Sequence, residues 1–112
     1  MGPKPPPGTS PLALDKVIHG PLRLGIVAAL ASGEPRTFTE LRAALGATDG
    51  NLNASLQRLE QAGYVSATRN LEGRVARSEY RLTRAGQKAL AHYLQHLEAI
   101  LGPLRGRAIL GS

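Results

Sequence analysis

The chain has 112 residues and a formal net charge of +6, with 14 Lys and Arg residues against 8 Asp and Glu residues. This length accommodates one domain and is too short for an enzyme whose cleft lies between two domains. Cysteine is absent, which excludes disulfides, thiol catalysis and cysteine-ligated zinc or iron–sulfur sites. Only 4% of the residues are aromatic, so aliphatic side chains must form a modest core, which favours oligomerisation. The basic, arginine-rich balance favours a polyanionic partner.

The ends of the chain predict no targeting or membrane segment. No apolar run approaches the roughly 18 residues of a membrane span. Residues 1–7 also lack the apolar stretch of a signal peptide. We therefore expect a cytoplasmic protein without a membrane partner. Residues 1–11 hold five of the eight prolines and are predicted to form a flexible tail.

Two helices are predicted after this tail. Residues 12–18 fit a short helix that ends at His19-Gly20. Pro21 suits the first position of a second helix, in which Leu22, Ile26 and Leu30 repeat at helical spacing. The cluster at 32–35, Ser-Gly-Glu-Pro, ends it.

A third and a fourth helix follow closely. Thr39 is the preferred N-cap of the third helix, although Thr37 with Glu40 also fits a capping box. Gly46 ends that helix. Thr48 or Asp49 then caps a fourth helix over about 50–62. The inward face of this helix comprises Leu52, Leu56 and Leu59.

The spacing of apolar residues changes to two after Gly63. Residues 64–69 and 75–82 read as the strands of a β-hairpin around a turn at 70–73. Thr83 caps a last helix over 84–101, with leucines at 90, 94, 97 and 101, which Gly102-Pro103 terminates. The predicted fold is mainly α with a β-hairpin, in the order α-α-α-α-β-β-α. Residues 12–101 form the domain and residues 102–112 a C-terminal tail.

The third and fourth helices form a helix-turn-helix candidate around Gly46-Ala47-Thr48. The face of the fourth helix opposite its leucines carries no large apolar residue. It comprises Asp49, Asn51, Asn53, Ala54, Gln57, Arg58 and Gln61. Amides and Arg are the groups that pair with base edges in a major groove. An ordinary solvated helix face is the alternative, but the face is rich in amides and a basic hairpin follows it.

The positive charge is concentrated in the hairpin and the start of the last helix. Residues 64–88 carry six cations and two anions. Arg74 follows Gly73 at the hairpin tip, where its side chain can reach a phosphate or a minor groove, and Arg69 and Arg77 flank it. Charge that merely protects a sheet edge is the alternative explanation.

Five short motifs follow one another along the chain. They are Phe38-Thr39-Glu40-Leu41, Thr48-Asp49-Gly50-Asn51-Leu52, LQRLEQAGYV at 56–65, Glu72-Gly73-Arg74 and YRLTRAG at 80–86. With these motifs, residues 12–101 resemble the winged helix-turn-helix domain of small MarR/ArsR-like transcriptional regulators. The resemblance implies a homodimer whose first and last helices pack on the partner. It also implies a recognition helix at 49–62 in the major groove and a wing tip at 70–74.

The resemblance and the residue pattern together predict two sets of functional residues. The expected contacts to double-stranded DNA are Thr39, Thr48, Asp49, Asn51, Asn53, Ala54, Gln57, Arg58, Arg69, Arg74 and Arg77. The expected dimer interface is Leu12, Leu14, Ile18, Leu94, Leu97 and Leu101. The expected function is sequence-specific DNA binding by a homodimeric, nucleoid-associated transcriptional regulator, a repressor. The effector ligand is left open.

Two other functions stay open at this point. A winged helix can serve as a protein–protein interaction module or as a nonspecific nucleic-acid binder. The first would expose apolar residues on the recognition face, and the second would carry more Lys there.

An enzyme and a cofactor are not expected. The chain has no glycine-rich phosphate loop and no catalytic triad motif. His92 and His96 share one face of the last helix, but acidic partners are few and Cys is absent. We therefore predict no metal site.

Overall fold

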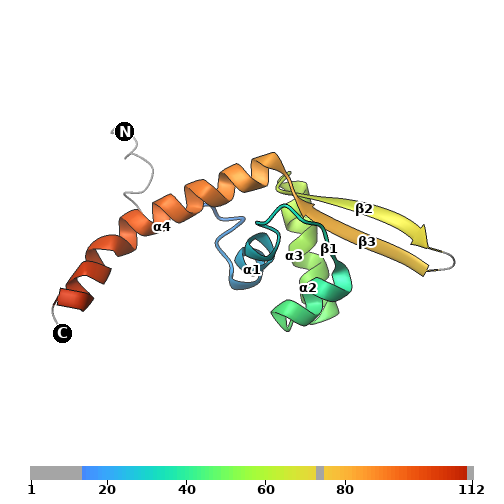
Figure 1. The fold of residues 1–112 in the computed structure, drawn as a ribbon, viewed down its shortest axis with the longest axis horizontal. Coiled ribbons are helices and arrows are strands. Elements are labelled where there is room, and N and C mark those ends of the chain that lie inside the picture. The colour runs from blue at the N-terminus through green and yellow to red at the C-terminus, as the bar shows by residue number, and fades with distance from the viewer. Residues whose placement is uncertain (1–13, 73–74, 111–112) are drawn as a thin grey trace.

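The computed structural model describes residues 14–72 and 75–110, with side chains at 14–71 and 77–104. Its elements are α1 (Pro21–Ala29), β1 (Arg36–Thr37), α2 (Phe38–Leu45), α3 (Asp49–Gln61), β2 (Val65–Glu72), β3 (Val75–Leu82) and α4 (Arg84–Leu110). The three helices α1 to α3 form the body, α4 extends from one side and the β2–β3 hairpin from the other (Figure 1). The predicted fold class, helices with a β-hairpin before the last helix, is confirmed.

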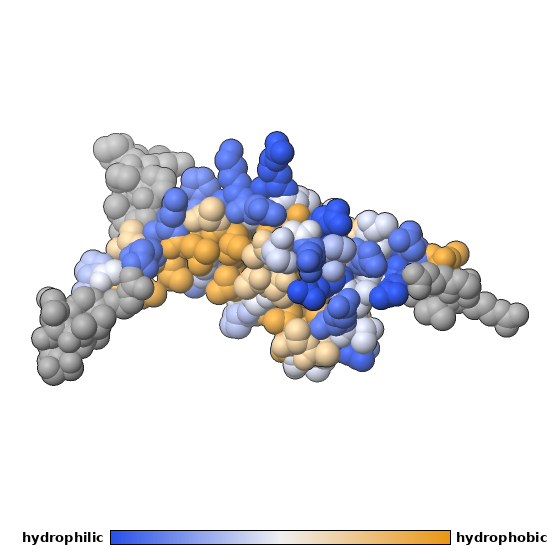
Figure 2. All heavy atoms as spheres, in the orientation of Figure 1, coloured by the Kyte–Doolittle hydropathy of each residue, from blue (hydrophilic) through white to orange (hydrophobic). Residues whose placement is uncertain are grey.

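Helix α4 is longer than predicted. Its predicted end at Gly102-Pro103 is wrong, because the helix continues through both residues to Leu110. A proline removes one backbone hydrogen bond and favours a kink, but it does not oblige a helix to end. Apolar side chains gather along α4 on the face seen in Figure 2. Leu94, Leu101 and Leu104 are 52%, 41% and 57% exposed.

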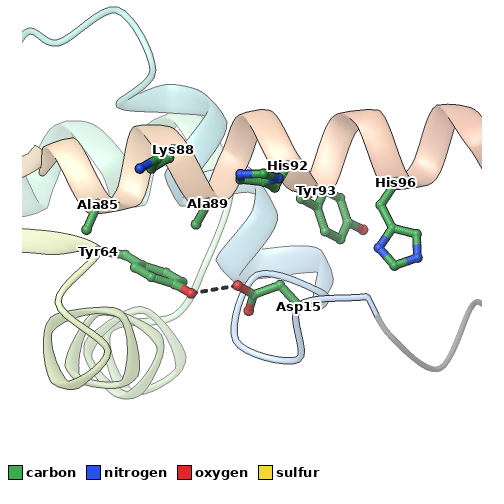
Figure 3. Close-up of a pocket in the computed structure, with 8 residues that line it drawn as sticks. All are labelled: Asp15, Tyr64, Ala85, Lys88, Ala89, His92, Tyr93 and His96. Atoms are coloured by element: carbon green, nitrogen blue, oxygen red, sulfur yellow. Dashed lines mark hydrogen bonds between the residues drawn. The ribbon is translucent and has the colours of Figure 1, made fainter. Parts of the chain in front are cut away.

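The predicted helix at 12–18 is also wrong over the described residues. Residues 14–20, which we name the N-terminal turn, form a turn. Oδ1 of Asp15 accepts hydrogen bonds from the amides of Val17 (2.9 Å) and Ile18 (3.2 Å). This side-chain acceptor satisfies amides at the start of the segment, and Gly20-Pro21 leaves no length for a helix to propagate. Oδ2, the other carboxylate oxygen of Asp15, faces Tyr64 (Figure 3).

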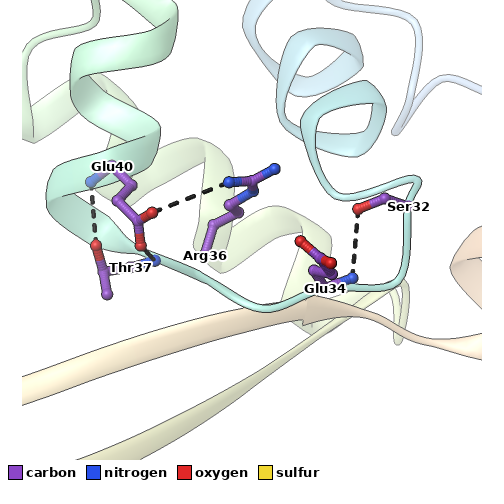
Figure 4. A network of polar contacts seen from close by, with 5 residues as sticks. All are labelled: Ser32, Glu34, Arg36, Thr37 and Glu40. Atoms are coloured by element: carbon purple, nitrogen blue, oxygen red, sulfur yellow. Dashed lines mark hydrogen bonds and ion pairs between the residues drawn. The ribbon is translucent and has the colours of Figure 1, made fainter.

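Helix α2 begins at a capping box. Oγ1 of Thr37 accepts from the Glu40 amide at 3.1 Å, and Oε1 of Glu40 accepts from the Thr37 amide at 3.0 Å (Figure 4). The preferred cap, Thr39, is therefore wrong, and the alternative, Thr37, is the N-cap. Hydrogen bonds from the amide and then the hydroxyl of Thr37 lower the pKa of Glu40 below 4.5. Gly46 ends α2 as predicted, at a φ of 60°.

Helix α3 begins as predicted. Thr48 is the N-cap, because its Oγ1 accepts from the Asn51 amide at 3.2 Å. The predicted inward leucines of α3 are all buried, and Gly63 follows the helix. Helix α1 packs against both α2 and α3, so these three helices enclose the main core and hold α3 in place.

The sheet has the order β1-β3-β2, and both pairings are antiparallel. Strand β1 was not predicted, since two residues are too few for an alternating pattern. It pairs Arg36 with Tyr80. The turn predicted at 70–73 begins too early, because β2 continues to Glu72, which pairs with Val75.

Candidate nucleic-acid interface

The outer face of α3 is the main candidate surface. The seven predicted residues of this face, Asp49, Asn51, Asn53, Ala54, Gln57, Arg58 and Gln61, are all exposed. Leu52, Leu56 and Leu59 lie at 0–1% exposure on the opposite face. The helix carries one cation, Arg58, against Asp49 and Glu60. Its exposed polar groups are therefore mostly amides, which can donate and accept hydrogen bonds without a net charge.

An ion pair that the sequence pattern did not indicate joins α2 to α3 across the turn between them. Nη1 of Arg42 donates to Oδ1 of Asp49 at 2.8 Å, and both side chains are about half exposed or more. Arg42 neutralises the only acidic group at the start of α3. The free N–H groups there can then donate to a phosphate without repulsion from an unpaired carboxylate. Thr39 lies exposed in the first turn of α2.

The pairing of the hairpin separates two of the predicted arginines. Arg69 pairs with Ser78, and Arg77 pairs with Asn70. Directly paired residues share a face and successive residues alternate, so Arg69 and Arg77 lie on opposite faces. Both are exposed. Arg77 is also near enough to α2 to lower the pKa of Glu40. Arg74 lies outside the described residues.

A cavity lies between α4 and the body. It has a volume of about 460 Å³ and is lined by Asp15, Tyr64, Ala85, Lys88, Ala89, His92, Tyr93 and His96 (Figure 3). His92 is exposed, whereas His96 is 8% exposed. Within the described residues, no three His, Asp or Glu side chains lie where they could hold a metal ion.

The predicted interface leucines fall into two groups. Leu14 and Ile18 are 8% and 0% exposed and pack on Tyr93 of the same chain, so their burial needs no partner. Leu94 and Leu101 are exposed on α4, and Leu97 is half-buried. Leu104 extends their spacing and was not predicted. Leu12 lies outside the described residues.

Comparison with known proteins decides the family. The family described as "Winged helix DNA-binding domain" matches residues 22–101. The chain belongs to this family. The predicted resemblance to small winged helix transcriptional regulators of the MarR-like type is confirmed. α3 is then the second helix of the helix-turn-helix, and the β2–β3 hairpin is the wing.

Relatives of this winged helix protein come from archaea and bacteria. An uncharacterized protein of Methanocaldococcus jannaschii is 31% identical over 83 residues, which are 73% of this chain and 89% of that protein. A transcriptional regulator homologue from Pyrococcus horikoshii OT3 has a solved structure that is 27% identical with a TM-score of 0.73. It covers 79% of this chain and 87% of its own. A candidate transcriptional regulator from Salmonella typhimurium, ytfH, is 26% identical with a TM-score of 0.64, covering 86% and 83%.

Among residues 14–72 and 75–110, none of the helices combines the length and the hydropathy that a membrane span needs.

Proposed function

We propose that this winged helix protein is a sequence-specific, homodimeric repressor that binds double-stranded DNA with α3 in the major groove. The observation that carries the proposal is the composition of the exposed face of α3, which is rich in amides and has little net charge. Such a face can read base edges through hydrogen bonds. The basic wing beside it supplies attraction to the phosphates.

Each predicted contact has a role in this proposal. Asn51, Asn53, Gln57 and Arg58 bind base edges, and Ala54 leaves room for a thymine methyl group. Thr39, Thr48 and the start of α3 hold phosphates, and Asp49 keeps its charge paired with Arg42. Arg69, Arg74 and Arg77 bind the backbone or the minor groove from the wing.

The homodimer rests on α4. Leu94, Leu101 and Leu104 leave large apolar surfaces in water, at 41–57% exposure. They recur at intervals of seven and three residues, the spacing of a helix that packs on another helix. A second copy of α4 covers this stripe and places two α3 helices on one DNA duplex. The proposed domain covers residues 12–101, and the proposed site of action is the nucleoid in the cytoplasm.

The test is selection of bound sequences from a random pool of duplex DNA. We expect enrichment of a palindrome whose half-sites lie about 10–10.5 base pairs apart, or a multiple of that. Placing that palindrome across a promoter then lowers transcription in vitro, as a repressor requires. A pool without enrichment, despite binding, indicates a nonspecific binder, and a pool without binding indicates a protein-interaction module.

A further inference from the structure

The N-terminal turn is hydrogen-bonded to three separate parts of the fold. The Tyr64 hydroxyl, between α3 and β2, donates to Oδ2 of Asp15 at 2.6 Å. The Tyr93 hydroxyl on α4 lies 2.9 Å from Nδ1 of His19. Nε of Arg23 on α1 donates to the Val17 carbonyl. This segment of seven residues thus connects the body, which contains α3, to α4.

Tyr64 is also where α4 meets the body. The Tyr64 carbonyl accepts from the Thr83 amide at 2.9 Å, and the Thr83 hydroxyl donates to the Gly63 carbonyl at 2.6 Å. A β-carbon on Gly86 would collide with the Tyr64 carbonyl. The first turn of α4 therefore rests directly on the backbone that follows α3, and this contact acts as a pivot.

Beyond this pivot, α4 packs on the body through Leu90, which lies on the main core, and through Tyr93, which packs near Leu24 of α1. The cavity of about 460 Å³ separates the α4 residues Lys88 and His92 from Tyr64 and Asp15 (Figure 3). On this side of α4, the cavity therefore leaves the helix room to tilt toward or away from Tyr64. The hydrogen bonds that link the two sides of the cavity run through the N-terminal turn, from Tyr64 to Asp15 and from His19 to Tyr93.

Hydrogen bonds hold the Asp15 carboxylate in one orientation. Oδ1 accepts from the Val17 and Ile18 amides, which leaves Oδ2 directed at Tyr64. The hydrogen bond from Tyr64 to Asp15 raises the pKa of Tyr64 to about 12, so the phenol keeps its proton at neutral pH. A hydrogen bond to a charged group contributes more than one between neutral groups.

We propose that Asp15 and Tyr64 form a latch that fixes the angle between α4 and α3, which makes them positioning residues for DNA binding. Because α4 carries the dimer contact, this angle sets the separation of the two α3 helices, a consequence that rests on the proposed function. Neither residue touches DNA. The latch instead selects among operators that differ in half-site spacing.

The first experiment measures the angle without DNA. The chain has no cysteine, so Ala54→Cys on α3 and Gln95→Cys on α4, both at exposed positions, carry a pair of spin labels. Labelled chains are diluted into excess unlabelled protein so that only distances within one chain are recorded. We expect one narrow distance distribution in the parent protein and broad distributions after Tyr64→Phe or Asp15→Asn. Unchanged distributions in both variants would overturn the latch.

Glu34→Gln is the matched control. It removes the same charge as Asp15→Asn from an exposed loop residue and should leave the distance distribution unchanged. Circular dichroism reports whether each variant folds. If Tyr64→Phe does not fold, Asp15→Asn decides the matter.

The second experiment uses the selected palindrome, with its spacing lengthened or shortened by one or two base pairs, and a single half-site. On the best palindrome, Tyr64→Phe should bind about tenfold more weakly, the size expected from one lost hydrogen bond to a charged group. Its affinity for the half-site should stay within about twofold, and its preference among spacings should flatten. Equal losses on both DNAs would indicate a merely structural role and overturn the latch. If the parent protein selects no palindrome, the proposed function fails, and the label distances alone decide the latch.

Discussion

Thr37 and Glu40 satisfy each other's backbone amides at the start of α2, while Thr39, two residues on, is exposed. Both threonines fit the sequence signal for an N-cap. The structure decides between them because Thr37 also lies in β1, whose pairing with Glu79 holds its backbone extended as an N-cap requires. For α3 the sequence left Thr48 and Asp49 open as caps, and the structure selects Thr48. At Thr37 the deciding contact is 42 residues away.

Removing the cap of α2 should destabilise the fold. We expect Thr37→Ala to lower the free energy of unfolding by about 1 kcal/mol, the usual cost of a lost N-cap, as measured by urea denaturation. Thr39→Ala is the control and should change it by less than about 0.5 kcal/mol. The reverse ranking would mean that Thr39 caps the helix.

The same capping box predicts a dependence on pH. Folding lowers the pKa of Glu40 below its value of 4.5, so its contribution to stability is present above that value and is lost as the pH falls through the folded pKa. The stability difference between the parent protein and Glu40→Ala should therefore shrink as the pH falls from about 6, above the unfolded pKa, through the folded pKa. A difference that stays constant over this range would exclude the Glu40 carboxylate as its source.

The contact of Gly86 with Tyr64 predicts that a single added methyl group is harmful. Gly86→Ala forces α4 away from the Tyr64 carbonyl and should destabilise the protein by about 1–3 kcal/mol, as overpacking does. Gly50→Ala is the control, because a β-carbon there meets nothing within 4 Å. It should be neutral or slightly stabilising in the same thermal unfolding measurement, as expected for Gly to Ala within a helix.

At the scale of elements, α3 and the hairpin were predictable because their apolar periods are unambiguous. Leu52, Leu56 and Leu59 repeat as a helix face and are buried. β1 was not predictable, since two residues have no period. The N-terminal turn failed as a predicted helix because the side chain of Asp15 takes the amides of Val17 and Ile18, a competition that hydrophobic spacing does not reveal.

Helix α3 and the wing should contribute differently to DNA binding. Gln57→Ala should relax the preference at one base pair, at a cost of about 1–3 kcal/mol of discrimination, and leave the salt dependence of binding unchanged. Arg69→Ala should weaken binding to all sequences and reduce the slope of log affinity against log salt concentration by about 1. Fluorescence anisotropy titrations at several salt concentrations measure both. An Arg69→Ala variant with an unchanged slope would argue against a phosphate contact.

At the scale of the whole molecule, the contacts that join elements were beyond the reach of the sequence. Asp15 and Tyr64 are 49 residues apart, and Arg42 meets Asp49 only because α2 and α3 turn sharply between them. The opposite faces of Arg69 and Arg77 depend on the strand register. The candidate DNA surface on α3 could be predicted because one helix carries it whole.

The exposed stripe of α4 predicts the oligomeric state. Light scattering should give twice the chain mass of 11.8 kDa. Leu94→Glu with Leu101→Glu should give the single chain mass without loss of helix, because both residues are already about half exposed and a charge in a packed seam is unfavourable. Leu71→Glu is the control, since Leu71 is 76% exposed on the wing, and it should leave the dimer intact. A parent protein with the single chain mass at micromolar concentration would contradict the dimer.

Because α4 is long, a small change of its angle at Gly86 moves its far end by a large distance. From Gly86 to Leu110 the helix spans about 36 Å, at 1.5 Å per residue. A rotation of roughly 5° about Gly86 would displace its far end by about 3 Å, close to the rise of one base pair of DNA. A tilt of α4 too small to disturb the core would thus move the far end of the helix by about one base-pair step. The close contact of Gly86 with the Tyr64 carbonyl opposes such a tilt.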